Sequence, residues 1–337
     1  MPTVQTFSVI ICAYTEARWD DLMRAVESVQ HQTLPPQELI VVVDHNPTLL
    51  ARVERKLPGV IAVENQEARG LSGARNRGIA AAHAMIVAFL DDDAVAAPDW
   101  LEQLERGYTD PQVAAVGGMI APRWCAGRPA WFPSEFDWVV GCTYRGMPVS
   151  DTPVRNLIGC NMSFRRSLVV ATGGFRIGRV GQLAIGQEDD ETEFCIRLAA
   201  TYPGIVILYR PTALVHHSVR SERGKVRYFV RRCFSEGLSK AGLARMVGRN
   251  QGLATERNYT LRTLPGGVVQ GIGAALTGRD VTGLLRAGAI IAGLLVTAMG
   301  YLLGQLRAPA GSATHLPATL PGTRPDIPAD HPVSSSH

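Results

Sequence analysis

The chain has 337 residues, which suit one large domain or two modest ones and give ample length for a buried core. Its formal net charge of +4 is too small to indicate a nucleic-acid-binding protein. The basic residues cluster after residue 219, which suggests an anionic ligand or a membrane surface. Six scattered cysteines without a CxxC pair argue against a zinc site and a disulfide scaffold, and fit a reducing compartment. No signal peptide precedes the first apolar run, so we expect a cytoplasmic location.

In the first third of the chain, short apolar runs alternate with segments of helical character. The expected strands are 7–12, 38–43, 60–63, 85–90 and 113–117, and the expected helices are 18–31, 47–57, 71–84 and 98–107. Strands and helices that alternate in this way predict an α/β fold with a doubly wound, mostly parallel, Rossmann-like sheet. We interpret residues 5–117 as a nucleotide-binding half.

The pattern is less regular further along the chain. Residues 118–155 are rich in Pro, Gly and Trp, which is more typical of a folded excursion near a site than of a regular element. Order returns at 156–164, a strand is expected at 205–208, and a basic helical stretch is expected over 222–248. An acidic helix start at 188–193 lies between residue 164 and the expected strand at 205–208.

The next feature is an uncharged stretch of 18 residues, 287–304, which is the minimum length for a membrane-spanning helix. Gly300 and Gly304 stand at a spacing that lets helices approach closely in lipid. The pattern fits a membrane segment over 286–305 that spans the bilayer or lies in its interface, and it also fits a buried core helix. The tail, 308–337, is rich in Pro, Ser and Thr and is expected to be disordered.

The most informative motif is the sequence FLDDD at 89–93, in which a strand-like apolar run ends in three acids. Ligands of α/β sheets bind at the carboxyl ends of the strands. Three neighbouring carboxylates repel one another unless a cation lies among them, and a divalent metal with oxygen ligands is the obvious candidate. A solvated acidic turn before a helix at Pro98 is the alternative, because acids are common near helix N-termini.

Polar residues also follow the other expected strands. The first strand ends in AYTE at 13–16, and the second ends in Asp44, a carboxylate that can accept a hydrogen bond from a nucleobase. The glycine-containing segment 70–78 carries Arg75 and Arg77 toward the same crevice, and arginine suits a diphosphate because its guanidinium forks onto two oxygens. Helix-surface charge is the alternative for these arginines. Together these positions indicate a nucleotide-sugar site.

The acidic helix start at 188–193 predicts a general base. Acids on the favourable end of the helix dipole would explain two or three carboxylates, but five of these six residues are acidic. A general base needs a carboxylate close to an acceptor hydroxyl, and like-charged neighbours can tune its pKa.

The order of these motifs resembles a family-2 glycosyltransferase with the GT-A fold, of the bacterial, membrane-associated type. The matching segments are SVIICAY at 8–14, Asp44, GARN at 73–76, FLDDD at 89–93, GCNMSFR at 159–165 and DETEFCIR at 190–197. The resemblance implies inverting transfer from a nucleoside-diphosphate sugar, with Mn or Mg as cofactor. The resemblance covers about residues 5–220 and implies a glycosyltransferase domain over 1–220, with a nucleotide-binding half at 5–117 and an acceptor half at 118–220. From its composition, the rest of the chain is expected to form a basic helical extension over 221–280, a hydrophobic membrane segment over 286–305 and the tail 308–337.

The same resemblance implies roles for single residues at the donor site. Asp93 and Asp91 are expected to hold the metal, and His216 or His217 is a further candidate ligand, since imidazole is compatible with Mn. A structural histidine at a strand end is the alternative for either of them. The residues expected to bind the nucleotide sugar are Ala13, Tyr14, Glu16, Asp44, Arg75, Asn76, Asp91 and Asp92.

Catalytic and acceptor roles are implied in the same way. The family usually has Glu-Asp before a Thr-Asp/Glu-Leu-Cys-x-Arg stretch, whereas this chain has Asp190-Glu191. Because of this inversion, Glu191 is the first candidate for the base and Asp190 the second. Asn161 is expected to bind sugar hydroxyls of the acceptor.

The basic stretch and the apolar segment after residue 220 favour an acceptor at the cytoplasmic face of the cell membrane. A polyprenyl-phosphate-linked sugar or glycan precursor in envelope or polysaccharide assembly is the leading hypothesis. A soluble acceptor and a non-catalytic, sugar-nucleotide-binding scaffold are the alternatives. A nucleotidyltransferase is disfavoured, because the AYTE segment at 13–16 is unsuited to cradling a triphosphate. UDP, GDP and dTDP donors all remain open.

Overall fold

The computed structural model describes residues 5–177, 190–247 and 258–306. At its centre is one mixed sheet in the order β3-β2-β1-β4-β8-β6-β9-β5, with β7 paired to β9. The strands are β1 (Phe7–Ala13), β2 (Glu38–Val43), β3 (Ile61–Glu64), β4 (Ile86–Asp91), β5 (Ala94–Ala96), β6 (Val113–Trp124), β7 (Thr152–Pro153), β8 (Asn161–Arg165) and β9 (Val206–Val219).

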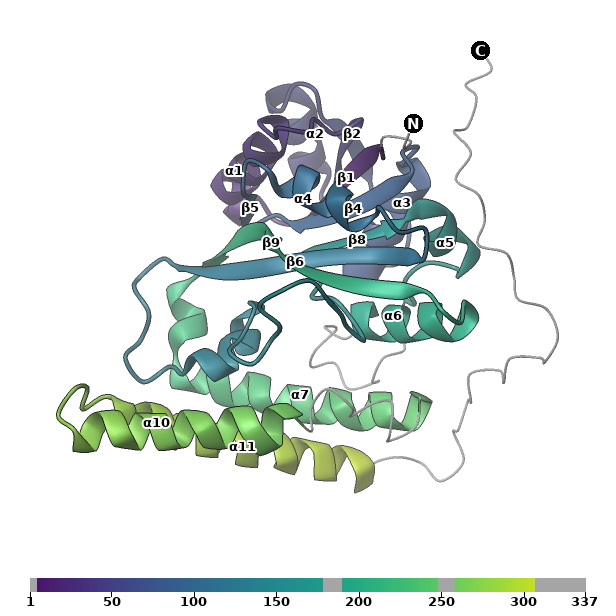
Figure 1. The fold of residues 1–337 in the computed structure, drawn as a ribbon. Coiled ribbons are helices and arrows are strands. Elements are labelled where there is room, and N and C mark those ends of the chain that lie inside the picture. The colour runs from purple at the N-terminus through teal and green to yellow at the C-terminus, as the bar shows by residue number, and fades with distance from the viewer. Residues whose placement is uncertain (1–4, 178–189, 248–257, 307–337) are drawn as a thin grey trace, which may run out of the picture.

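Helices cover the sheet and form a separate layer beyond it (Figure 1). Those around the sheet are α1 (Trp19–Gln30), α2 (Pro47–Lys56), α3 (Leu71–Ala81), α4 (Trp100–Gly107), α5 (Arg166–Ala171) and α6 (Asp190–Thr201). The layer consists of α7 (Val226–Val247), α10 (Leu264–Leu276) and α11 (Gly283–Leu306). Short turns of 3-10 helix are η1 (Glu16–Arg18), η2 (Ser134–Val140) and η3 (Ser221–Gly224), and η4 (Tyr259–Thr263) is a π-helical turn.

The first half of the sheet is parallel, as the alternating pattern predicted. β1 pairs with β2 and β4, so that Ile10 lies beside Ile40 and Phe89. Successive residues of β1 enter different cores, because side chains alternate across a strand. Ile11 packs in the core that includes α1 and α2, whereas Ile10 packs in the core that includes α3. The α/β fold class with helices on both faces is therefore confirmed.

The second half departs from the expected mostly parallel sheet. β8 runs antiparallel to both β4 and β6, while β6 and β9 run parallel to each other for most of their length. β6 and β9 are also much longer than the expected runs 113–117 and 205–208. Gly118 permits their close approach at a register shift, since a Cβ there would lie 1.8 Å from the Ala213 carbonyl oxygen.

The excursion after β6 packs through aromatic rings against the helical layer. Phe229 of α7 lies edge-on to Trp131 and Phe132, with ring centroids 5.4 and 5.5 Å apart. Phe136 of η2 contacts the same Phe229 at 5.2 Å. These rings fix α7 to the excursion, because aromatic pairs add directional attraction to the apolar area that they bury.

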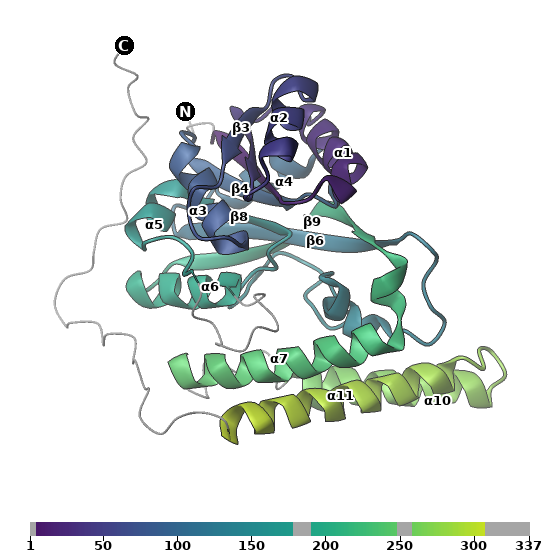
Figure 2. The same ribbon diagram turned by 180° about the vertical axis from the view of Figure 1, so that it is seen from behind.

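The helical layer lies along one side of the molecule, with α11 packed lengthwise against α7 and beside α10 (Figures 1 and 2). The expected basic helix is α7, and the expected hydrophobic segment is α11, which extends a few residues beyond the uncharged stretch at its N-terminal end. Within the part of the chain that the structure describes, α11 is the single helix long and apolar enough to cross a membrane. The predicted tail, 308–337, lies outside the described residues.

Two glycines of α11 give a matched test of this packing. A Cβ at Gly300 would lie 2.3 Å from the Phe234 carbonyl oxygen of α7, whereas a Cβ at Gly288 would meet nothing within 4 Å. We expect Gly300→Ala to lower the free energy of unfolding by about 1–3 kcal/mol through overpacking. Gly288→Ala should raise it by up to about 1 kcal/mol, because Ala loses less backbone entropy than Gly in a helix. Urea unfolding measures both, and equal effects would contradict the packing of α11 on α7.

Candidate active site

Three side chains that could hold a metal ion meet at the carboxyl end of β4. Asp91 ends this strand, Asp93 follows it, and His217 comes from β9, where it pairs with Ala94. One ligand atom from each of Asp91, Asp93 and His217 lies within 4.8 Å of the other two. The backbone N–H of Ser218 donates to the Asp93 carbonyl oxygen at 2.8 Å, which fixes the two segments together.

Asp93 is buried, and positive groups compensate its charge. His217 Nε2 lies 3.1 Å from Asp93 Oδ1, and Arg18 Nη1 lies 3.2 Å from Asp93 Oδ2. Burial alone would raise the pKa of Asp93, but the hydrogen bond from His217 and the nearby positive charges lower it to about 2. The carboxylate is therefore charged at neutral pH, as a metal ligand must be.

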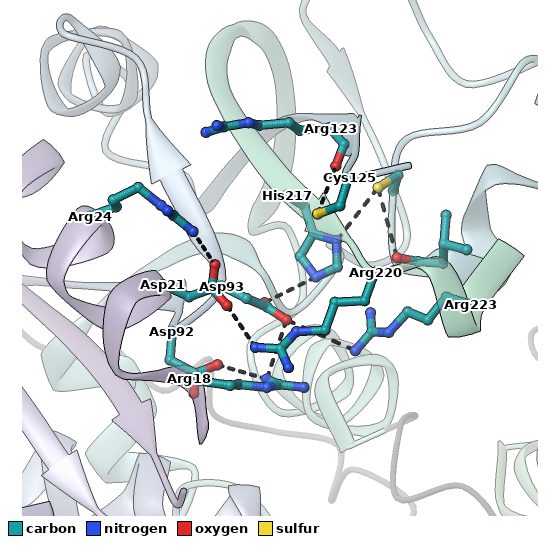
Figure 3. Close-up of polar contacts among 12 residues, drawn as sticks. Arg18, Asp21, Arg24, Asp92, Asp93, Arg123, Cys125, His217, Arg220 and Arg223 are labelled. Carbon is teal, nitrogen blue, oxygen red and sulfur yellow. Dashed lines mark hydrogen bonds and ion pairs between the residues drawn. The ribbon is translucent and has the colours of Figure 1, made fainter. Parts of the chain in front are cut away.

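Arginine side chains lie close to Asp92 and Asp93, as Figure 3 shows for Arg18, Arg220 and Arg223. Arg223 reaches to 4.0 Å from Asp93 Oδ2, and Arg220 is held by Asp21 at 2.7 Å. Arg18 lies nearer to Asp93 Oδ2 than Arg223 does. It belongs to η1, the short turn that follows β1. Guanidinium groups at such a place could also bind the oxygens of a diphosphate.

Asp92 differs from its two neighbours. Its Oδ1 accepts a hydrogen bond from Arg18 Nη1 at 2.8 Å. Burial raises the pKa of Asp92 to about 7 even though Arg18 opposes this, and the charge of Asp93 adds to the rise. Asp92 thus fixes Arg18 in place rather than joining the group formed by Asp91, Asp93 and His217.

The residues expected at the nucleotide lie around the ends of β1 and β2. Tyr14 and Glu16 are exposed, and Ala13 is buried at the end of β1. Asp44 follows β2 and accepts hydrogen bonds from Asn65 Nδ2 at 2.6 Å and from the Gly70 N–H at 3.0 Å. Its carboxylate therefore holds the start of α3 in position, in addition to facing this edge of the sheet.

Carboxylates at the start of α6 are connected to α3. The Ser72 hydroxyl donates to Asp190, and Arg75 Nη1 lies 3.6 Å from Glu191 Oε2. Burial raises the pKa of Asp190, although the Ser72 hydrogen bond and the Arg75 charge act against this rise. Glu191 is less buried than Asp190 and lies beside Gly159, where a Cβ would be 3.4 Å from its carboxyl carbon. A carboxylate in such a place can accept a proton from a hydroxyl.

Comparison with known proteins decides the family. Residues 8–172 match the family described as Glycosyl transferase family 2. The chain is 37% identical over 239 residues to glucosyl-dolichyl phosphate glucuronosyltransferase of Haloferax volcanii, a match that covers 69% of this chain and 75% of the relative. The chain belongs to glycosyl transferase family 2. It is a glycosyltransferase.

Other glycosyltransferases agree with this assignment. Succinoglycan biosynthesis protein ExoM of Rhizobium meliloti is 25% identical over 260 residues, covering 74% of this chain and 78% of the relative. The mannosyltransferase PcManGT of Pyrobaculum calidifontis, solved with GDP-Man and Mn2+, superposes with a TM-score of 0.57 at 20% identity, covering 88% of each chain. This likeness confirms the GT-A-like fold. Because the relatives include archaeal and bacterial proteins, the bacterial type remains a prediction.

The family's expected acceptor residue, Asn161, needs correction. Its side chain is fully buried, Nδ2 donates to the Met119 and Ala213 carbonyl oxygens, and Oδ1 accepts from Trp100 Nε1. All of its hydrogen-bonding groups face the protein, so Asn161 holds β8 against β6, β9 and α4 rather than a sugar. A buried amide is stable only when its polar atoms are paired in this way.

Two further expected residues lie elsewhere. His216 is exposed on the opposite face of β9 from His217, because neighbouring side chains of a strand point to opposite sides. Asn76 bonds the backbone of Phe175, donating to its carbonyl oxygen at 2.7 Å and accepting from its N–H at 2.8 Å. The amide of Asn76 therefore holds the loop after α5, and its contact with the nucleotide sugar stays a prediction.

Sequence reasoning did not find Arg18 and Ser72. Both lie within a few residues of recognised motifs, yet their partners are distant in the chain: Arg18 contacts Asp92, and Ser72 contacts Asp190. An arginine just after a strand end and a serine in a glycine-containing helix start carry no local signal for such contacts.

Replacing Asn161 separates its structural role from an acceptor role. Asn161→Ala removes the hydrogen bonds of Asn161 to the Trp100 N–H and to two carbonyl oxygens in the core, so we expect the free energy of unfolding to fall by about 3 kcal/mol or more. Asn156→Ala is the control, because Asn156 is only partly buried and should cost less than about 1 kcal/mol. Thermal and urea unfolding measure both. Normal stability of Asn161→Ala with weakened acceptor binding would restore the acceptor assignment.

Proposed function

We propose that this glycosyltransferase moves a sugar from a nucleoside-diphosphate sugar to a hydroxyl acceptor with inversion, using a divalent metal, Mn or Mg. The observation that carries the proposal is the group formed by Asp91, Asp93 and His217 at the end of β4. It stands at the edge of the sheet where α/β proteins bind their ligands. The solved relative PcManGT, with GDP-Man and Mn2+, has the same fold.

The donor set fits a divalent cation. Two carboxylates and an imidazole are suitable ligands for Mn. Asp93 is already charged, so it does not have to lose a proton before it binds the ion. When bound, such a cation would offset the negative charge that develops on the leaving diphosphate. Asp91, Asp93 and His217 would hold it, while Arg18 and Arg223 keep the buried carboxylate of Asp93 compensated.

Glu191 is the proposed general base, with Asp190 as second candidate. Asp190 is engaged by the Ser72 hydroxyl and is more deeply buried, whereas Glu191 is more open and faces Arg75. In this role Glu191 accepts the proton of the acceptor hydroxyl as its oxygen attacks the anomeric carbon. The attack comes from the face opposite the leaving group, so the configuration inverts.

The donor nucleotide is proposed to lie along the ends of β1 and β2. Tyr14 offers an exposed ring, and Asp44 offers a carboxylate. Arg75 is buried and close to Glu191, so it would neutralise charge within the site rather than lie on a helix surface. Ala13, Glu16, Asp91 and Asp92 remain proposed contacts of the nucleotide sugar.

For the acceptor, we propose a lipid-linked sugar or glycan precursor at the cytoplasmic face of the membrane. The Haloferax relative is named for action on a glucosyl-dolichyl phosphate, and ExoM is named for succinoglycan biosynthesis. In this proposal, residues up to 220 carry out the glycosyl transfer, and the helical layer after them provides membrane association. A soluble acceptor is the second candidate, and a non-catalytic scaffold is disfavoured because the acidic groups are complete.

A panel of nucleotide sugars tests the function and the metal site together. We expect one donor to raise the melting temperature and to be hydrolysed only when Mn or Mg is added. His217→Ala should weaken Mn binding at least about 10-fold, because even partners one step removed from a metal have effects of that size. His216→Ala, one residue away and exposed, should leave Mn affinity unchanged. Titration calorimetry measures the Mn affinity of both variants. Equal Mn affinities of the two variants would refute the ligand role of His217.

The two acids at the start of α6 are separated by isosteric variants. Glu191→Gln should lower kcat by about 10²- to 10⁴-fold with donor binding intact, since a general base acts in the transition state. Asp190→Asn should retain more activity, because its amide can still bond Ser72. Steady-state kinetics with the identified donor make the comparison. A greater loss of kcat in Asp190→Asn would assign the base to Asp190 instead.

A further inference from the structure

One face of α11 is open and carries only apolar side chains and glycine. Leu295 and Leu302 on this face are 64% and 62% exposed. Soluble monomers seldom expose a continuous apolar strip along a whole helix, and this helix is about 36 Å long. The exposed residues of α11 are Leu284, Leu285, Gly288, Ile291, Ala292, Leu295, Ala298, Met299, Leu302 and Leu306.

The strip continues onto α10, which lies beside α11 (Figures 1 and 2). Val269, Ile272 and Leu276 of α10 are exposed, and Val281 is exposed in the connection between the two helices. We call the exposed apolar residues of α10, α11 and their connection the α10–α11 face. It is broader than one helix, because α10 packs against the first part of α11, where Gly271 meets Gly283 and Gly267 lies close to Ile290.

The opposite side of α11 is closely packed on α7. A Cβ at Gly237 of α7 would lie 2.1 Å from the Thr297 carbonyl oxygen, so the two backbones touch. Arg245 of α7 donates to the Gly304 carbonyl oxygen at 2.8 Å. α11 therefore lies along the protein, and it could cross a bilayer only by giving up this packing. Gly300 and Gly304 of α11 are used for this contact with α7.

Charge identifies what covers the α10–α11 face. Residues 226–306 include ten Arg or Lys but only three Asp or Glu, although the whole chain has a net charge of only +4. Arg262 and Arg279 are exposed next to the two ends of α10. An apolar face bordered by basic residues complements the surface of a bilayer that contains anionic lipids.

We propose that the α10–α11 face docks in the interface of an anionic lipid bilayer, with both helices parallel to the membrane plane and neither crossing it. The apolar side chains enter the boundary between headgroups and acyl chains, and the arginines contact lipid phosphates. The proposal deepens the membrane association proposed above by giving its surface and orientation. α7 starts directly after η3, which places Arg223 at Asp93, so the docked layer joins the site through one short connection.

Flotation of the full chain with vesicles tests the docking. Wild type should float with vesicles of phosphatidylcholine and phosphatidylglycerol, and much less with phosphatidylcholine alone. Leu295→Asp should lower the partition coefficient at least about 10-fold. Val170→Asp is the matched control, because Val170 is 56% exposed on α5, away from the helical layer, and it should float like wild type. Failure of wild type to float, or normal flotation of Leu295→Asp, would overturn the proposal.

Depth measurements distinguish lying flat from spanning. Spin labels at residues 284, 295 and 306, introduced singly in a Cys125→Ser background, should all report the same shallow depth from oxygen and nickel-chelate accessibility. A deep label at 295 with the outer two at opposite surfaces would establish a spanning helix and refute the proposal. A wild-type dimer that Leu295→Asp dissociates, without vesicle binding, would assign the face to a second copy of the chain and refute it too.

The test is independent of the reaction. Donor-induced stabilisation and metal-dependent hydrolysis of the donor in solution should be the same for Leu295→Asp and wild type, because Leu295 lies on the outer face of α11. Loss of flotation with hydrolysis retained therefore supports the docking surface. Absence of hydrolysis in every variant, with flotation as expected, would count against the proposed function alone.

Discussion

The site depends on one buried carboxylate, that of Asp93, and on the charges that compensate it. A buried ion without partners is strongly unfavourable, so Asp93 requires positive or hydrogen-bonding groups close by. His217 from β9, Arg18 from η1 and Arg223 from η3 provide them. These segments are far apart in the chain, and their convergence on one side chain brings β4, the end of β1 and the end of β9 to the same edge of the sheet.

A second set of contacts joins the two halves of the catalytic region. Ser72 and Arg75 of α3, in the parallel half, contact Asp190 and Glu191 of α6, in the half that follows β8. α3 itself is held through Gly70 by Asp44. The acids of α6 are thus positioned relative to the edge where the metal and donor are proposed to bind. This coupling explains why residues with ordinary local roles, such as Ser72, matter to the geometry of the site.

Much of the fold could be predicted because its signals are local. Apolar runs that become β1, β2 and β4 are buried on both faces, and their pattern does not depend on their neighbours. Strand direction was not predictable for β8, because the direction depends on how the excursion after β6 returns to the sheet. Asn161 shows the corresponding limit for the site: its motif indicated a ligand contact, whereas its burial and its partner Trp100 are properties of the packed core.

The sequence alone determined the α/β class, the family and the acids at 91–93 and 190–191, since each depends on local patterns and on their order along the chain. Only the tertiary structure decided that His217 rather than His216 faces the acids, because this choice depends on the register between β5 and β9. It also decided that α11 lies along α7, since an apolar run of this length has the same composition whether it spans, docks or packs. What distinguishes these three arrangements is the neighbouring helix, α7, against which glycines of α11 pack.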